Sequence, residues 1–111
     1  MTQLTFTSRM EEDHLVVTTS GYINQHGGEN IAKECFKYID EGTTKVILDL
    51  KDSKVVNSIG VSVLIEVIEK LNDVKGTLTF INLEPPIEKT FTIMGLFQYA
   101  KKADSLEAAM Q

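Results

Sequence analysis

Two short apolar runs with a long helical pattern between them place the strongest limit on how this chain can fold. The first run, "TTKVILDL" at 43–50, is nearly continuous and rich in β-branched residues, which is typical of a central strand covered on both faces. Residues 58–71 then carry apolar side chains at helical spacing. The second run, "GTLTFINL" at 76–83, predicts another strand. Strand, helix and strand in this order indicate a sheet that is backed by helices.

The segment before these runs predicts a hairpin and a further helix. Residues 4–7 and 15–19 are β-like runs, and the charged connector between them suits a hairpin. From Glu29 to Ile39 the apolar residues recur at helical spacing. Gly42 follows at the place where a left-handed residue would end that helix.

The last third of the chain predicts two more helices. "EPPIEKTFTIMG" at 84–95 has its prolines near the first turn, where a missing N–H costs little, and Gly95 at its end. "DSLEAAMQ" at 104–111 pairs Asp104, a candidate N-cap, with Glu107 three residues later. The short segment between them could add one strand. We therefore expect one α/β domain over residues 1–111, with a mixed sheet of four to five strands packed with about four helices.

Charge and cysteine content exclude several classes of function. A net charge of −5 argues against a nucleic-acid partner, because such proteins present clustered basic surface. Cys35 is the only cysteine, so no disulfide within the chain and no four-cysteine metal site can form. His14 and His26 are too few and too poorly spaced for zinc. No apolar stretch approaches the roughly 18 to 20 residues that span a bilayer. We expect a soluble, cytoplasmic protein with no cofactor, metal or membrane partner.

Ser58 occupies the point where the loop after the first apolar run passes into the helical pattern. It could simply be the N-cap, which is the commoner role of a serine at a helix start. Helical spacing places it at the polar edge of the helix beside Glu69, so its hydroxyl should face water. A helix start carries about half a positive charge and unpaired N–H groups. A phosphate added to Ser58 would therefore be held rather than repelled.

Other residues near Ser58 have structural explanations beside functional ones. Val63 and Val67 widen the apolar arc of the helix to about 200°, twice what one core contact requires, so either a neighbouring helix or a partner covers them. Burial in the core is the commoner outcome for such residues. Asn24 and Asn57 are more often turn formers that bond their own backbone. We assign no chemical role to Asp49, because a carboxylate near a strand end commonly serves solubility.

Three segments together resemble the STAS domain, which is found in sulfate transporters and anti-sigma factor antagonists. "VILDLKDSKVVNSIGVSVLIEVI" is similar to the family signature, in which a strand ends in a loop reading Asp-Ser-Ser/Thr-Gly and a helix begins. "TSGYIN" resembles the segment that closes the second family strand, and "FTIMGLFQYAKKADSLEAAM" resembles the family ending. The likeness covers nearly the whole chain in order. It implies a STAS-type fold.

The resemblance implies a regulator without catalysis of its own. In its unmodified state it would bind an anti-sigma factor that is also a serine kinase, and phosphorylation at Ser58 would release it until a serine phosphatase acts. Asn57 and Asn24 depart from the family, which usually has acidic residues there, and both changes remove charge that would repel a phosphate. The predicted partner-binding residues lie around the start of the helix: Asn24, Asn57, Ser58, Ile59, Gly60 and Val63.

Two other functions stay open at this point. Some STAS proteins resemble accessory subunits of a lipid-transporting ATPase, in which the helix surface docks and no serine is modified; Asn57 is compatible with such a scaffold. An enzyme is the other alternative, but the chain has neither a glycine-rich nucleotide pattern nor a nucleophile elbow. The glycine pair 27–28 lacks the third glycine and the acidic ribose ligand of a nucleotide site.

Overall fold

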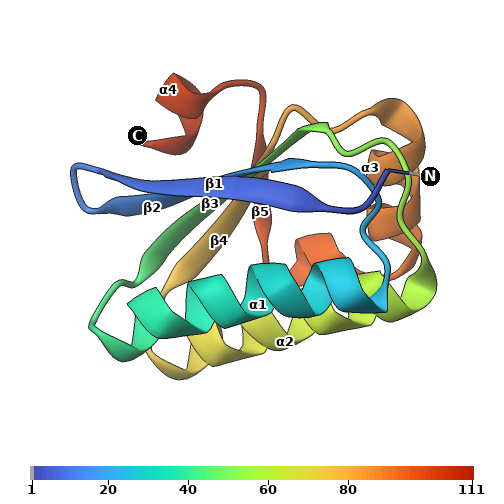
Figure 1. Ribbon diagram of the computed structural model, residues 1–111. Helices are drawn as coiled ribbons and strands as arrows, with labels where there is room; N and C mark the ends of the chain where they lie inside the picture. The colour runs from blue at the N-terminus through green and yellow to red at the C-terminus, as the bar shows by residue number, and fades with distance from the viewer. Residues whose placement is uncertain (1) are drawn as a thin grey trace.

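The computed structural model describes residues 2–111 and contains five strands, four α-helices and one short 3₁₀-helix (Figure 1). The predicted hairpin, the strand-helix-strand unit and the two C-terminal helices are all present. In chain order the elements are β1 (Thr5–Glu11), β2 (His14–Ser20), α1 (Gln25–Asp40), β3 (Lys45–Asp52), α2 (Ser58–Asp73), β4 (Thr77–Ile81), α3 (Pro85–Ile93), η1 (Leu96–Gln98), β5 (Lys101–Ala103) and α4 (Leu106–Ala109).

The strands form one mixed sheet in the order β1-β2-β3-β4-β5. β1 and β2 pair antiparallel as the hairpin, and the other three pairs are parallel. Parallel neighbours need a crossover, and α1, α2 and α3 supply one each between successive strands. This topology confirms the predicted α/β class and mixed sheet, and it confirms the upper figure of five strands.

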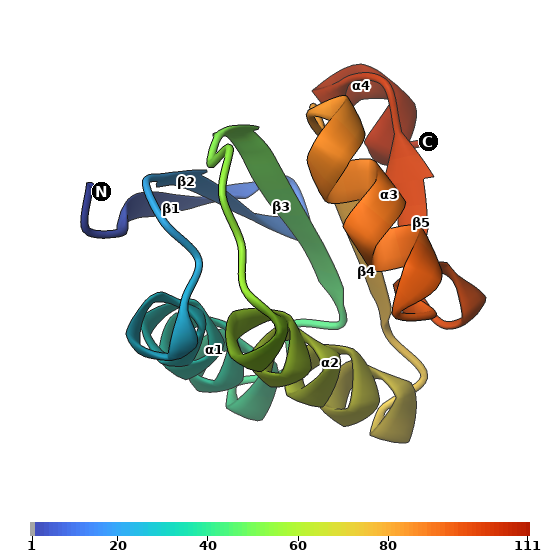
Figure 2. The same ribbon diagram turned by 90° about the vertical axis from the view of Figure 1, so that its right-hand side faces the viewer.

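The central strand β3 is covered on both faces, as its continuous apolar run predicted. Val46, Leu48 and Leu50 pack into the main core, which the sheet forms with α1, α2 and α3. Ile47 points the opposite way and joins Val16 and Ile81 in a small second cluster, against which residues of the α4 segment pack. Figure 2 shows α1 and α2 side by side on one face of the sheet and α4 on the other.

Helix ends differ from the sequence predictions in two places. α1 begins at Gln25 rather than at Glu29, because Asn24 caps it and the glycine pair 27–28 forms part of its first turn. α4 is capped by Ser105, whose hydroxyl accepts from the Ala108 amide, and not by Asp104. Gly42 and Gly95 do adopt left-handed conformations, with φ of 109° and 82°, after α1 and α3.

Several features of the described residues bear on chemistry. Cys35 is fully buried on α1, and burial raises the pKa of its thiol to about 12, so it behaves as a core residue. Among residues 2–111, no group of three or more His, Cys, Asp or Glu side chains is placed to hold a metal ion. Nor does any helix in that range have the length and apolar character to cross a membrane.

Candidate functional site

The loops that lead into α1 and α2 are joined by backbone hydrogen bonds. The Ile23 amide donates to the Val55 carbonyl at 3.0 Å, and the Ile23 carbonyl accepts from the Asn57 amide at 3.1 Å. Ile23 is completely buried, which anchors this bridge in the core. Because each loop enters its helix one or two residues later, the starts of α1 and α2 are held together on the same side of the molecule (Figure 1).

An asparagine caps each of these helices. Asn24 Oδ1 accepts from the Gly27 amide, and Asn57 Oδ1 accepts from the Gly60 amide, both at 2.8 Å. The structural explanation of Asn24 and Asn57, side chains that bond their own backbone, is therefore confirmed. The N-cap interpretation of Ser58 is wrong, because Ser58 is the first residue of α2 and follows its cap.

Ser58 presents its hydroxyl to solvent, as the helical spacing predicted. Within the described part of the chain no hydrogen bond is made by this hydroxyl, and the Ser58 carbonyl accepts from the Ser62 hydroxyl at 2.9 Å. The amides of Ser58 and Ile59 precede the first helical bond, which the Val61 amide makes to the Asn57 carbonyl. Neither α1 nor α2 has an acidic residue in its first turn. An anion held at this helix start would therefore meet no carboxylate from the first turn of either helix.

Gly60 is buried where the two helices meet, so it shapes the surface instead of contacting a partner with a side chain. A Cβ at Gly60 would lie 2.3 Å from the Ile23 carbonyl oxygen. A Cβ at Gly28 on α1 would lie 3.0 Å from the Gly60 carbonyl oxygen. Sequence reasoning considered the glycine pair 27–28 only as a nucleotide pattern and missed this packing. The available signal was a glycine in the first turn of both helices.

The other predicted site residues divide into exposed and covered positions. Ile59 is 53% exposed beside Ser58, which is unusual for a large apolar side chain. Val63 is half-buried and packs against the core, whereas Val67 is fully buried. The core thus covers Val67 entirely, and α1 lies against Val63, since a Cβ at Gly28 would lie 3.1 Å from Val63 Cβ. We call the group formed by Asn24, Asn57, Ser58, Ile59 and Val63 the helix-start surface.

Asp49 has a structural role in place of the solubility role that its sequence position suggested. Its side chain is buried on β3, and Oδ1 accepts from the Lys51 amide and from Asn82 Nδ2, each at 3.1 Å. A buried carboxylate with two donors stabilises the loop geometry rather than meeting water. It ties the end of β3 to the residue after β4, and it lies outside the helix-start surface.

Replacement of Asn57 by Ala is expected to destabilise the protein by about 1 kcal/mol, because the Gly60 amide loses its acceptor. Asn57→Asp keeps a cap oxygen and adds a negative charge beside the positive end of the α2 dipole. We expect Asn57→Asp to be at least as stable as the native protein. Urea unfolding of both variants measures this, with Asn24→Ala as the equivalent cap deletion on α1; equal stabilities of Asn57→Ala and Asn57→Asp would contradict the cap assignment.

Comparison with known proteins assigns the chain to a domain family. The sequence profile of the STAS domain matches residues 5–109, and the chain belongs to the STAS domain family. Among relatives, BtrV of Bordetella bronchiseptica, named as a candidate anti-sigma factor antagonist, is 30% identical over 95 residues, which are 86% of this chain and 82% of BtrV.

Solved structures share the same fold. A candidate anti-sigma factor antagonist of Thermotoga maritima superposes with a TM-score of 0.86 at 18% identity, covering 95% of this chain and 91% of that one. The unphosphorylated form of the anti-sigma factor antagonist SpoIIAA gives a TM-score of 0.75 at 23% identity, with 93% and 91% covered. The phosphorylated Bacillus SpoIIAA gives the same TM-score at 24% identity, with 96% of both chains covered. The predicted STAS-type domain is thereby confirmed.

Proposed function

We propose that this protein is a cytoplasmic anti-sigma factor antagonist whose binding is switched at Ser58. Unmodified, it binds an anti-sigma factor that is also a serine kinase; phosphorylated, it is released, and a serine phosphatase restores it. The observation that carries the proposal is the solvent-facing Ser58 hydroxyl, free of hydrogen bonds within residues 2–111, on the first turn of α2. The name of BtrV and the two forms of SpoIIAA support the same reading.

The switch needs no catalytic group in this chain. The kinase would transfer the terminal phosphoryl group of ATP to the Ser58 oxygen, with loss of the hydroxyl proton and departure of ADP. The product carries about 1.5 to 2 extra negative charges and three acceptor oxygens. The free amides at the start of α2 can donate to those oxygens, so the modified helix is not destabilised. The effect of the phosphate is then exerted on the partner and not on the fold.

The helix-start surface would be the centre of the contact with the kinase. Ile59 supplies exposed apolar area next to the hydroxyl, and the two asparagine caps hold both loops in place without adding charge. Docking would remove Ser58 from water. A charged phosphate enclosed there without a partner of opposite charge carries a large desolvation cost. Phosphorylation therefore favours the free protein.

Mass spectrometry of the protein purified from its own cells, with and without phosphatase treatment, tests the modification directly. We expect one added phosphate that maps to Ser58, disappears on phosphatase treatment and is absent from Ser58→Ala. The matched control is Ser62→Ala, which removes another exposed serine hydroxyl one turn later on α2 and should leave the phosphate in place. A protein that is never modified at Ser58 under any growth condition would favour the constitutive scaffold, of the kind that supports a lipid-transporting ATPase.

A further inference from the structure

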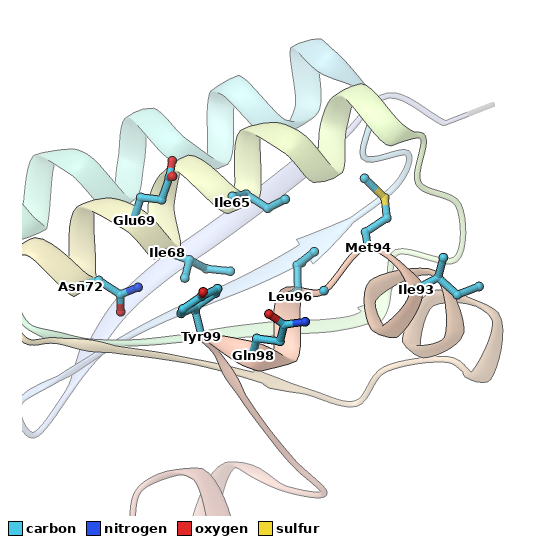
Figure 3. A pocket seen from close by; sticks show the side chains of 10 residues that line it. Ile65, Ile68, Glu69, Asn72, Ile93, Met94, Leu96, Gln98 and Tyr99 are labelled. Carbon is cyan, nitrogen blue, oxygen red and sulfur yellow. The ribbon is translucent and has the colours of Figure 1, made fainter.

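A second surface, an apolar groove, runs between α2 and the segment that joins α3 to β5. It encloses about 540 Å³. Figure 3 shows its floor and ends: Ile68 and Leu96 face each other in the middle, Tyr99 and Asn72 stand at one end, and Met94 stands with Ile93 at the other. Ile68 and Leu96 are buried beneath the groove. We call this surface the α2–η1 groove.

The rim of the groove exposes large apolar side chains to an unusual degree. Ile93 is 74% exposed and Tyr99 is 68% exposed, the two highest values among the exposed large apolar residues of the described chain. Ile65 and Met94 are half-buried, and they line the same groove as Ile93 and Tyr99. Large apolar residues that gather around a hollow, instead of being scattered singly, are typical of an interaction site.

The charge that lines the groove is negative. Glu69 is the only charged residue that lines it. Glu69 is exposed and takes part in no ion pair within residues 2–111. Lys70, by contrast, is already paired with Asp40 at 2.9 Å. A complementary partner therefore brings apolar side chains and a positive charge.

The groove is continuous with the helix-start surface along α2. Ser58, Ser62, Ile65, Glu69 and Asn72 follow one another at intervals of three or four residues, which places them along one side of the helix. Ile65, the first of them to line the groove, lies about 10 Å along the axis from Ser58. One partner can thus reach both surfaces.

The helix-start surface is too small to be a complete interface. Stable complexes commonly bury about 800 Å² and 20 to 30 residues on each side, whereas the helix-start surface consists of five residues, of which Asn24, Asn57 and Val63 are half-buried. The adjoining groove supplies further area of the apolar kind that forms the centre of interfaces.

We propose that the α2–η1 groove receives an amphipathic helix of the anti-sigma factor kinase, with aliphatic anchors in the groove and Lys or Arg opposite Glu69. This inference rests on the proposed function, and it deepens that function by naming the chemistry of the partner. The helix docks along α2 and positions the kinase over Ser58. Docking in the groove does not itself require a phosphate, so it is testable on the unmodified chain.

The test uses synthetic peptides on the folded full chain. The probe, the Lys peptide, is an 18-residue amphipathic peptide with Leu at helical spacing and Lys on the flanks. The control, the Glu peptide, has every Lys replaced by Glu. Titration followed by amide NMR is expected to show binding of the Lys peptide, with shifts at Ile65, Ile93 and Tyr99. Ile93→Ser, Tyr99→Ser and Glu69→Lys should each weaken binding about tenfold. Met10→Ser is the control, since Met10 is 43% exposed on β1, at the opposite edge of the sheet.

Three outcomes would overturn the inference: no binding of the Lys peptide, equal binding of the Glu peptide, or shifts outside the groove. A fourth is self-association of the chain that Ile93→Ser abolishes, because the occupant would then be a second copy. Each of these readouts is independent of phosphorylation. If Ser58 carries a phosphate but the groove binds no peptide, only the inference about the groove is wrong. If the groove binds the Lys peptide but Ser58 is never modified, the proposed phosphorylation switch is wrong.

Discussion

Ser58→Glu is expected to weaken the complex with the anti-sigma factor kinase by about 100-fold or more. The substitution adds one negative charge at the centre of the helix-start surface, where docking would exclude water from the side chain. Enclosing a charge without a compensating partner costs a few kcal/mol, and each 1.4 kcal/mol is about a factor of ten in affinity. The kinase is first isolated as the protein that copurifies with Ser58→Ala. Isothermal titration calorimetry of the purified kinase with the native protein and with Ser58→Glu then measures the difference in affinity.

The controls separate the position of the charge from its presence. Ser58→Ala should bind as the native protein does, since the hydroxyl makes no hydrogen bond within residues 2–111 that the substitution would break. Thr7→Glu adds the same charge on β1, at an exposed position next to Phe6, which packs on the core; side chains alternate along a strand, so Thr7 faces away from α1 and α2. We expect Thr7→Glu to bind normally. Equal affinities for Ser58→Ala, Ser58→Glu and the native protein would remove the switch.

The stability of Ser58→Glu should match or exceed that of the native protein, which makes a binding defect interpretable. Ser58 is exposed and its side chain contributes no packing to the core. A carboxylate in the first turn also interacts favourably with the helix dipole, by about 0.3 to 1 kcal/mol. Loss of binding in a folded, stable variant therefore reports on the interface.

The sheet could be predicted from sequence because its strands carry the signal locally. The β3 run is apolar on both faces, and the structure shows why: Leu48 and Leu50 pack under the helices while Ile47 packs under α4. Such a pattern needs no distant information. The start of α1 could not be placed in this way, because two consecutive glycines weaken any helical pattern, and only the cap at Asn24 brings them into the helix.

The residue that caps α2 illustrates what local sequence lacks. Asn and Ser are almost equally good N-caps, so "NS" at 57–58 leaves the choice open. The hydrogen bond from the Asn57 amide to the Ile23 carbonyl decides it, since it fixes Asn57 in an extended conformation outside the helix. Ile23 is 34 residues away in the chain. Because Asn57 takes the cap position, the Ser58 hydroxyl is not used to cap α2.

The α2–η1 groove had no signal in the sequence at all. Its two sides come from residues 65–72 and 93–99, which belong to different elements. Exposure of Ile93 and Tyr99 depends on how η1 turns after Gly95, whose φ of 82° redirects the chain. Hydrophobic spacing can indicate which residues are apolar, but it cannot indicate which of them the fold leaves uncovered.

Gly60→Ala is expected to destabilise the protein by about 3 kcal/mol. In an exposed helix the same change would be stabilising by about 1 kcal/mol. Here the new Cβ would lie 2.3 Å from the Ile23 carbonyl oxygen and 2.8 Å from that of Asn24, and both are backbone atoms that cannot turn aside. The α1 loop must move, which strains the hydrogen bond between Ile23 and Asn57. Overpacking of this kind outweighs the gain in helix propensity.

Gly28→Ala is the matched control, since Gly28 is also a buried helical glycine at the same contact. Its Cβ would lie 3.0 Å from the Gly60 carbonyl oxygen and 3.1 Å from Val63 Cβ, so a few tenths of an ångström of movement accommodates it. Urea unfolding should therefore rank native and Gly28→Ala close together, with Gly60→Ala well below them. Unfolding of Gly60→Ala at the same or a higher urea concentration than the native protein would contradict this prediction. The close approach of Gly60 to the loop before α1 would then not be what holds the helix-start surface, including Ser58, in place.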